Sequence, residues 1–81
     1  MNWTKERDEI GVIHWLQIND EYFAKVEKSG GGDYFACIYK EGDPCGGEVE
    51  YFSNLRHAKL FAEQLSISGN WKNYLLNENQ I

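Results

Sequence analysis

Four side chains in the sequence could bind a metal ion or form a nucleophile–base pair: His14, Cys37, Cys45 and His57. Zinc sites are normally built from closely spaced Cys or His pairs, whereas seven residues separate the two cysteines. A cysteine nucleophile needs a base within hydrogen-bond reach and a third group that orients the base. Cys37 in a predicted strand and His57 on the first turn of a predicted helix have no such group. We therefore predict no catalytic residue, no metal site and no cofactor.

Carboxylates are the other candidate chemical groups. Residues 41–50 hold four acidic side chains and no basic one: Glu41, Asp43, Glu48 and Glu50. Glu48 and Glu50 point the same way along a strand, which could in principle support acid–base catalysis, but a short hairpin strand offers no cleft. On a hairpin, the four carboxylates could instead pair with Arg or Lys of a partner protein and raise the association rate. A solvated hairpin is the alternative.

The charge balance narrows the choice of partner. Thirteen acidic and eight basic side chains give a net charge of −5. Nucleic-acid-binding domains normally carry a basic stripe, so we expect no direct contact with nucleic acid, and for the same reason none with anionic membranes. An acidic domain is drawn toward basic protein surfaces, although the same charge also keeps a small protein soluble.

Two cysteines allow one disulfide at most, whereas small disulfide-stapled secreted domains usually carry four or more. We also find no apolar run of the length of a signal peptide or a membrane span. The expected compartment is therefore the cytoplasm.

The elements that would position these side chains follow from periodicity and turn residues. β-branched and aromatic stretches bounded by Gly, Asn and Asp predict strands at 12–18, 21–28, 34–40 and 48–52. An apolar stripe predicts a helix that begins at Ser53, whose hydroxyl would cap it, and ends at Gly69. A weaker pattern predicts a short helix over 71–77. Residues 1–10 are ambiguous: Trp3 anchors a tail, or Thr4 caps a helical turn.

Short connections make antiparallel neighbours the default. We predict one α+β domain over residues 1–81, a four-stranded antiparallel β-meander packed on one C-terminal α-helix, with a short extra helix or tail. Alternation, with Lys40 opposite Gly47, places seven residues on the helix-facing side: Tyr22, Ala24, Val26, Ala36, Ile38, Val49 and Tyr51.

The opposite side of this predicted sheet would be unusually aromatic for a monomer. It would carry Phe23, Lys25, Phe35, Cys37, Tyr39 and Phe52, with Glu48 and Glu50 nearby. Three explanations stay open: tails carrying Trp3 and Trp71 cover it, a second copy covers it in a homodimer, or it binds a partner. The predicted partner-binding residues are Glu41, Asp43, Glu48, Glu50, Phe23, Phe35 and Tyr39.

In size, acidity and lack of catalytic motifs, the chain is similar to the small acidic proteins with which phages block host defence, including anti-CRISPR proteins. That resemblance implies a viral inhibitor that occludes a basic nucleic-acid channel. We therefore expect a non-enzymatic inhibitor or adaptor that docks an acidic hairpin on a basic surface of a nucleic-acid-handling complex. The alternative is an accessory subunit that self-associates through its aromatic face, and a small enzyme or ligand carrier comes third.

Overall fold

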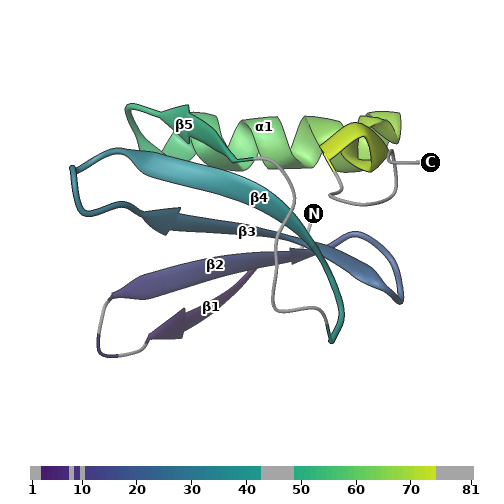
Figure 1. The fold of residues 1–81 in the computed structure, drawn as a ribbon, viewed down its shortest axis with the longest axis horizontal. Coiled ribbons are helices and arrows are strands. Elements are labelled where there is room, and N and C mark those ends of the chain that lie inside the picture. The colour runs from purple at the N-terminus through teal and green to yellow at the C-terminus, as the bar shows by residue number, and fades with distance from the viewer. Residues whose placement is uncertain (1–2, 8, 10, 43–48, 75–81) are drawn as a thin grey trace.

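The structure is a computed structural model that describes residues 3–7, 9, 11–42 and 49–74. The elements follow in the order β1 (Trp3–Arg7), β2 (Val12–Gln17), β3 (Tyr22–Lys28), β4 (Tyr34–Lys40), β5 (Glu50–Phe52), α1 (Leu55–Ser68) and the 3₁₀-helix η1 (Asn70–Tyr74). The strands form one antiparallel sheet in sequence order, and α1 lies across one side of it (Figure 1). The predicted α+β meander on a C-terminal helix is confirmed.

The structure adds a fifth strand, β1, at the N-terminal edge of the sheet. Residues 4–7 are all exposed, and Lys5, Glu6 and Arg7 give this strand none of the apolar alternation that reveals a half-buried strand. Its register is set by the pairing of Trp3 with Leu16 and of Arg7 with Val12. Charged side chains are typical of an edge strand, because they discourage pairing with further chains.

Helix α1 is capped by Asn54, not by Ser53 as predicted. Asn54 has extended backbone angles, and its side-chain oxygen accepts a hydrogen bond of 2.9 Å from the backbone N–H of His57. At the other end, Gly69 is left-handed with φ 82°, and its N–H donates to the carbonyl of Leu65. Glycine adopts this conformation without a Cβ clash, so the predicted helix end is confirmed.

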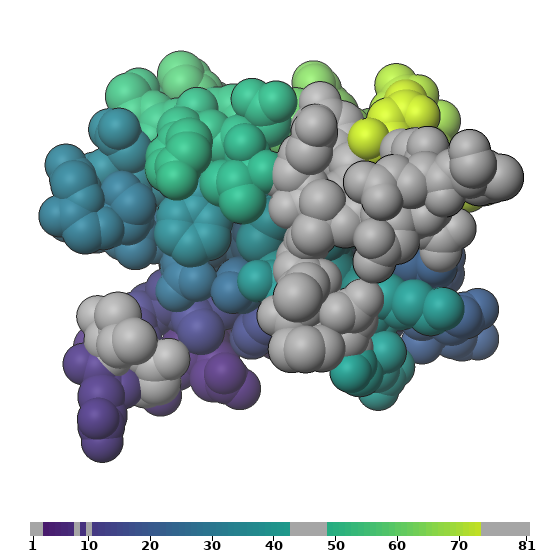
Figure 2. Space-filling view, viewed as in Figure 1, coloured from purple at the N-terminus to yellow at the C-terminus, as the bar shows by residue number. Residues whose placement is uncertain are grey.

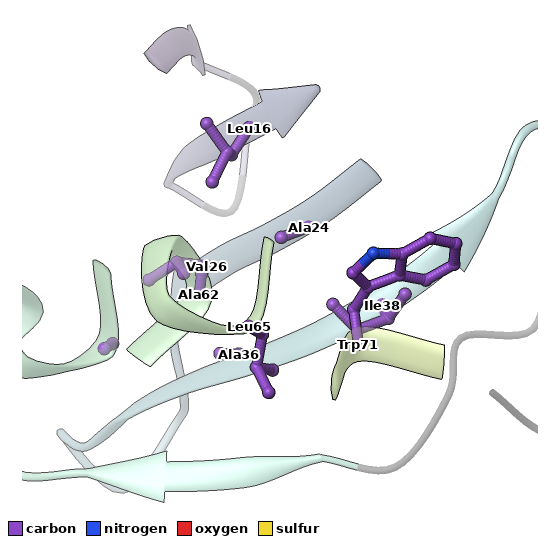
Figure 3. Close-up of a cluster of buried hydrophobic side chains, with 9 residues drawn as sticks. Leu16, Ala24, Val26, Ala36, Ile38, Ala62, Leu65 and Trp71 are labelled. Atoms are coloured by element: carbon purple, nitrogen blue, oxygen red, sulfur yellow. The ribbon is translucent and has the colours of Figure 1, made fainter. Parts of the chain in front are cut away.

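The core lies between α1 and the central strands, and its residues are small where the two layers touch. Ala24 and Val26 of β3 and Ala58 and Ala62 of α1 are completely buried. Small side chains on both surfaces let the helix approach the sheet closely. The remaining buried core residues are Leu16, Ala36, Ile38, Leu65 and Trp71 (Figure 3).

Both terminal tryptophans lie on the helix side of the sheet. Trp3 packs against the core cluster, and its indole N–H donates a hydrogen bond of 2.7 Å to a carboxylate oxygen of Glu63 in α1. Trp71 is buried, with its ring 4.7 Å from that of Tyr22. Of the three explanations for the aromatic opposite face, the one in which Trp3 and Trp71 cover it therefore does not hold.

The register between β4 and β5 also differs from the prediction by one residue. Pairing Lys40 with Gly47 would place Cys37 opposite Glu50, but Ala36 is the residue opposite Glu50. A shift of one residue moves every side chain of a strand to the other face.

Strand β5 shows that inversion. Phe52 faces the core side, with its ring 5.0 Å from that of Phe61 in α1. Tyr51, predicted in the core, is 64% exposed, and its ring lies 6.2 Å from that of Phe35. Val49, predicted beside it, is exposed as well.

Candidate protein-binding face

The side of the sheet that α1 does not cover is called the open face below. Strand alternation and the observed register define it. Its central residues are Trp15, Phe23, Lys25, Phe35, Cys37, Tyr39 and Tyr51. Three of the predicted partner-binding residues, Phe23, Phe35 and Tyr39, thus share one surface, which Trp15 and Tyr51 extend.

A continuous row of rings runs across three strands of the open face. Phe23 stacks on Tyr39, its direct cross-strand partner, with ring centroids 5.7 Å apart and an interplanar angle of 5°. On its other side Phe23 meets the ring of Trp15 edge to face at 5.0 Å. Both arrangements are favourable for aromatic pairs. The row is therefore ordered by contacts within the sheet itself.

Lys25 lies at the centre of this aromatic row. Its ammonium nitrogen is 4.7 Å from the ring centroid of Tyr39, 5.9 Å from that of Trp15, and 3.1 Å from a carboxylate oxygen of Glu27. Burial acts to lower the pKa of Lys25, but hydrogen bonds to Tyr39 and Glu27 outweigh it and raise the pKa. Lys25 therefore stays charged and its ammonium group is held in place. It puts one charged group at the centre of the largely apolar open face.

Cys37 lies on the open face but is only 3% exposed, and its thiol is free. Burial raises the pKa of this thiol, although the nearby Lys25 partly offsets the effect. The thiol is accordingly protonated at neutral pH and is a poor nucleophile. His57 belongs to α1 on the other side of the sheet, so the fold does not bring these two residues together. Cys45 lies outside the described residues.

A recess of about 380 Å³ adjoins the aromatic row. Its walls are Thr4, Trp15, Gln17 and Phe23. The side-chain amide of Gln17 donates to the backbone carbonyls of Asn19 and Tyr22, which holds it in place. The recess thus combines two ring walls with polar groups, a composition common in ligand-binding pockets.

Of the predicted acidic hairpin, the structure describes Glu41 and Glu50. Asp43 and Glu48 lie outside the described residues, and Glu50 lies opposite Ala36, several residues along the strand from Glu41. The backbone N–H of Glu41 instead donates to the carbonyl of Glu21 at 2.7 Å.

Glu41 thereby joins the β2–β3 turn in an exposed cluster, the acidic corner, made of Asp20, Glu21 and Glu41. The corner lies at the end of the sheet where Phe23 pairs with Tyr39. Nineteen residues separate Glu21 from Glu41 in the chain. The predicted pairing of strands 21–28 and 34–40 was the sequence signal that could have brought the two residues together.

Comparison of the chain with protein-family models, with curated proteins and with solved structures returns no match in any of the three. Within the part of the chain that the structure describes, neither helix combines the length and the apolar character that crossing a bilayer requires.

Proposed function

We propose that the protein is a non-enzymatic binding domain, an inhibitor or adaptor, that docks its open face and acidic corner on a basic surface of a partner protein. The observation that carries the proposal is the ordered row Trp15–Phe23–Tyr39, which ends beside the acidic corner. No described segment lies over this row.

The geometry of the aromatic row is typical of residues that contribute most of the binding energy of an interface. Trp, Tyr and Arg dominate the binding energy of protein interfaces, and they act best at the centre of a desolvated patch with a polar rim. Rings that are already stacked lose little conformational freedom on binding, so more of the contact energy becomes affinity. Lys25 and Glu27 form a charge pair inside the patch, which favours partners with matching polar groups.

The partner's charge follows from the acidic corner and the net charge of −5. Asp20, Glu21 and Glu41 favour a surface rich in Lys and Arg, as found on nucleic-acid-handling complexes in the cytoplasm. The resemblance to phage anti-defence proteins in size and charge agrees with this class of partner.

The test is affinity capture of the tagged protein from a candidate host lysate, treated with nuclease, at low and high salt, followed by binding measurements with the captured partner. We expect Tyr39→Ala to lose about 2 kcal/mol or more of binding free energy. Ile67→Ala, a matched change of an exposed apolar residue on α1, should bind like the parent protein. Equal binding by both variants contradicts docking through the open face.

A charge-reversal pair tests the acidic corner separately. Glu21→Lys with Glu41→Lys should slow association and reduce the salt dependence of the association rate, because long-range steering depends on these exposed charges. An unchanged association rate would remove the acidic corner from the interface while leaving the aromatic row in place.

Self-association is the second candidate, favoured by the 64% exposure of Tyr51 beside Phe35 at the edge of the same face. Sedimentation of the parent protein and of Tyr51→Lys distinguishes the two. A salt-resistant dimer that Tyr51→Lys converts to a monomer assigns the face to a second copy.

A further inference from the structure

A second hollow, of about 340 Å³, lies on the helix side of the sheet, next to the first turn of α1. Its lining residues are Lys5, Gly11, Val12, His14, Glu27, Lys28, Tyr34 and Leu55. Gly11 immediately precedes β2, and the others come from β1–β4 and from α1, at the end of the sheet where β2 begins and β3 ends. Figure 2 shows a notch at this end, between the purple residues of β1 and β2 and the blue residues near the β3–β4 turn.

The hollow is basic, although the chain as a whole is acidic. Lys5, His14 and Lys28 line it, and the positive charge of Lys59, whose ammonium nitrogen lies 4.9 Å from the ring centroid of Trp3, acts on His14. Burial lowers the pKa of His14, and the positive charges of Lys59 and Lys5 lower it further by opposing protonation of the imidazole. The imidazole is accordingly neutral at pH 7 and retains one N–H donor.

No carboxylate neutralises these lysines within the described residues. Glu27, the one acidic residue that lines the hollow, forms an ion pair with Lys25 on the open face. Glu63 accepts the indole hydrogen bond of Trp3. The first turn of α1 holds no acidic residue, which leaves the positive end of the helix dipole unneutralised beside Leu55.

We propose that this hollow binds the phosphate group of a small organic phosphate monoester. Lys5 and Lys28, which line the hollow, supply point charges for a dianion, and lysine is a frequent phosphate ligand in proteins. Val12, Tyr34 and Leu55 offer apolar walls for the organic part of the ester. The volume falls within the range of small-molecule sites. The hollow and the open face lie on opposite sides of the sheet, so each can be tested without the other.

Amide NMR titration of the whole protein with phenyl phosphate tests the proposal, with benzoate and inorganic phosphate as comparison ligands. We expect saturable shifts at Val12, His14, Lys28 and Leu55, with phenyl phosphate tighter than either comparison ligand. Benzoate binding as tightly contradicts the choice of phosphate, and inorganic phosphate binding as tightly contradicts the role of the apolar walls.

Charge-removal variants locate the site. Lys5→Gln and Lys28→Gln, both at exposed positions, should each weaken phenyl phosphate binding about fivefold, the size expected for one contact charge pair in water. Lys40→Gln removes the same charge at the opposite end of the sheet and should leave the dissociation constant unchanged. Equal weakening by all three variants, or no saturable shift with the parent protein, overturns the proposal.

Discussion

The two faces of the sheet use the same strands but opposite kinds of residue. Toward α1 the central strands present Ala24, Val26 and Ala36, all fully or nearly fully buried. Away from it they present Phe23 and Tyr39, whose rings stay partly exposed. The small residues gain their burial from the helix, whereas the aromatic residues bury one another. Stability therefore resides mainly on the covered face, and the open face retains apolar surface for a partner.

The sharpest test of this contrast compares two neighbours on β4 that point to opposite faces. Ile38→Ala removes a side chain that is 2% exposed and should cost about 2–5 kcal/mol of unfolding free energy, through lost burial and a cavity. Tyr39→Ala removes a half-buried ring and should cost about 1–2 kcal/mol. Urea unfolding followed by circular dichroism measures both. A larger loss for Tyr39→Ala would make the open face the principal core.

A second test concerns the close approach of the two layers. Ala62 is completely buried against the sheet, so Ala62→Leu should overfill the contact and cost about 1–3 kcal/mol. Gln64→Leu adds a similar apolar side chain at an exposed position of the same helix and should stay within about 0.5 kcal/mol of the parent protein. If Ala62→Leu proved neutral in thermal unfolding, α1 would have room to lie farther from the sheet.

The sequence was sufficient to predict the central strands and the helix, but not the strands at the two edges of the sheet. The strands 12–18, 21–28 and 34–40 and the helix ending at Gly69 were predictable, because alternation, helical spacing and turn residues agreed there. Strand β1 was missed because an edge strand needs no apolar alternation. The register of β5 was missed because the glycine-containing sequence 41–47 does not determine how many residues form the loop. A shift of one residue exchanges the faces of the sheet on which Tyr51 and Phe52 lie.

The candidate sites depend on pairings across the sheet, which explains what the sequence left out. Phe23, Phe35 and Tyr39 were predictable as one surface, since they alternate within two adjacent strands. The acidic corner needs the contact between Glu21 and Glu41, and the basic hollow brings together Lys5 and Lys28 from separate strands. Such clusters become visible only when the register of the strands is known.

A third prediction concerns the cap that holds the covering helix in place. Asn54→Ala removes the acceptor of the His57 N–H and should cost about 1 kcal/mol, as is typical for N-cap asparagine. Ser53→Ala should be nearly neutral, because Ser53 precedes the cap. Thermal unfolding of the two variants would decide which residue caps α1, and a larger loss for Ser53→Ala would reverse the assignment.

The smallest expected effect concerns His14, which lines the hollow on the helix side of the sheet. The folded state lowers the pKa of His14, through burial first and then through Lys59 and Lys5, so the unfolded state takes up the proton more readily. The His14 contribution to stability is therefore complete above the unfolded pKa of about 6.5 and is lost as the pH falls through that value toward the folded pKa. The difference in unfolding free energy between pH 7.5 and pH 5.5 should be larger for the parent protein than for His14→Gln.

Lys59→Gln should lie between the two, because it removes one of the two charges that oppose protonation of His14 but leaves burial unchanged. Denaturant unfolding of all three proteins at both pH values provides the measurement. Taking differences between the proteins removes the contribution of the titratable groups that they share. An equal pH dependence in the parent protein and in His14→Gln would mean that the imidazole is as well solvated in the folded state as in the unfolded chain.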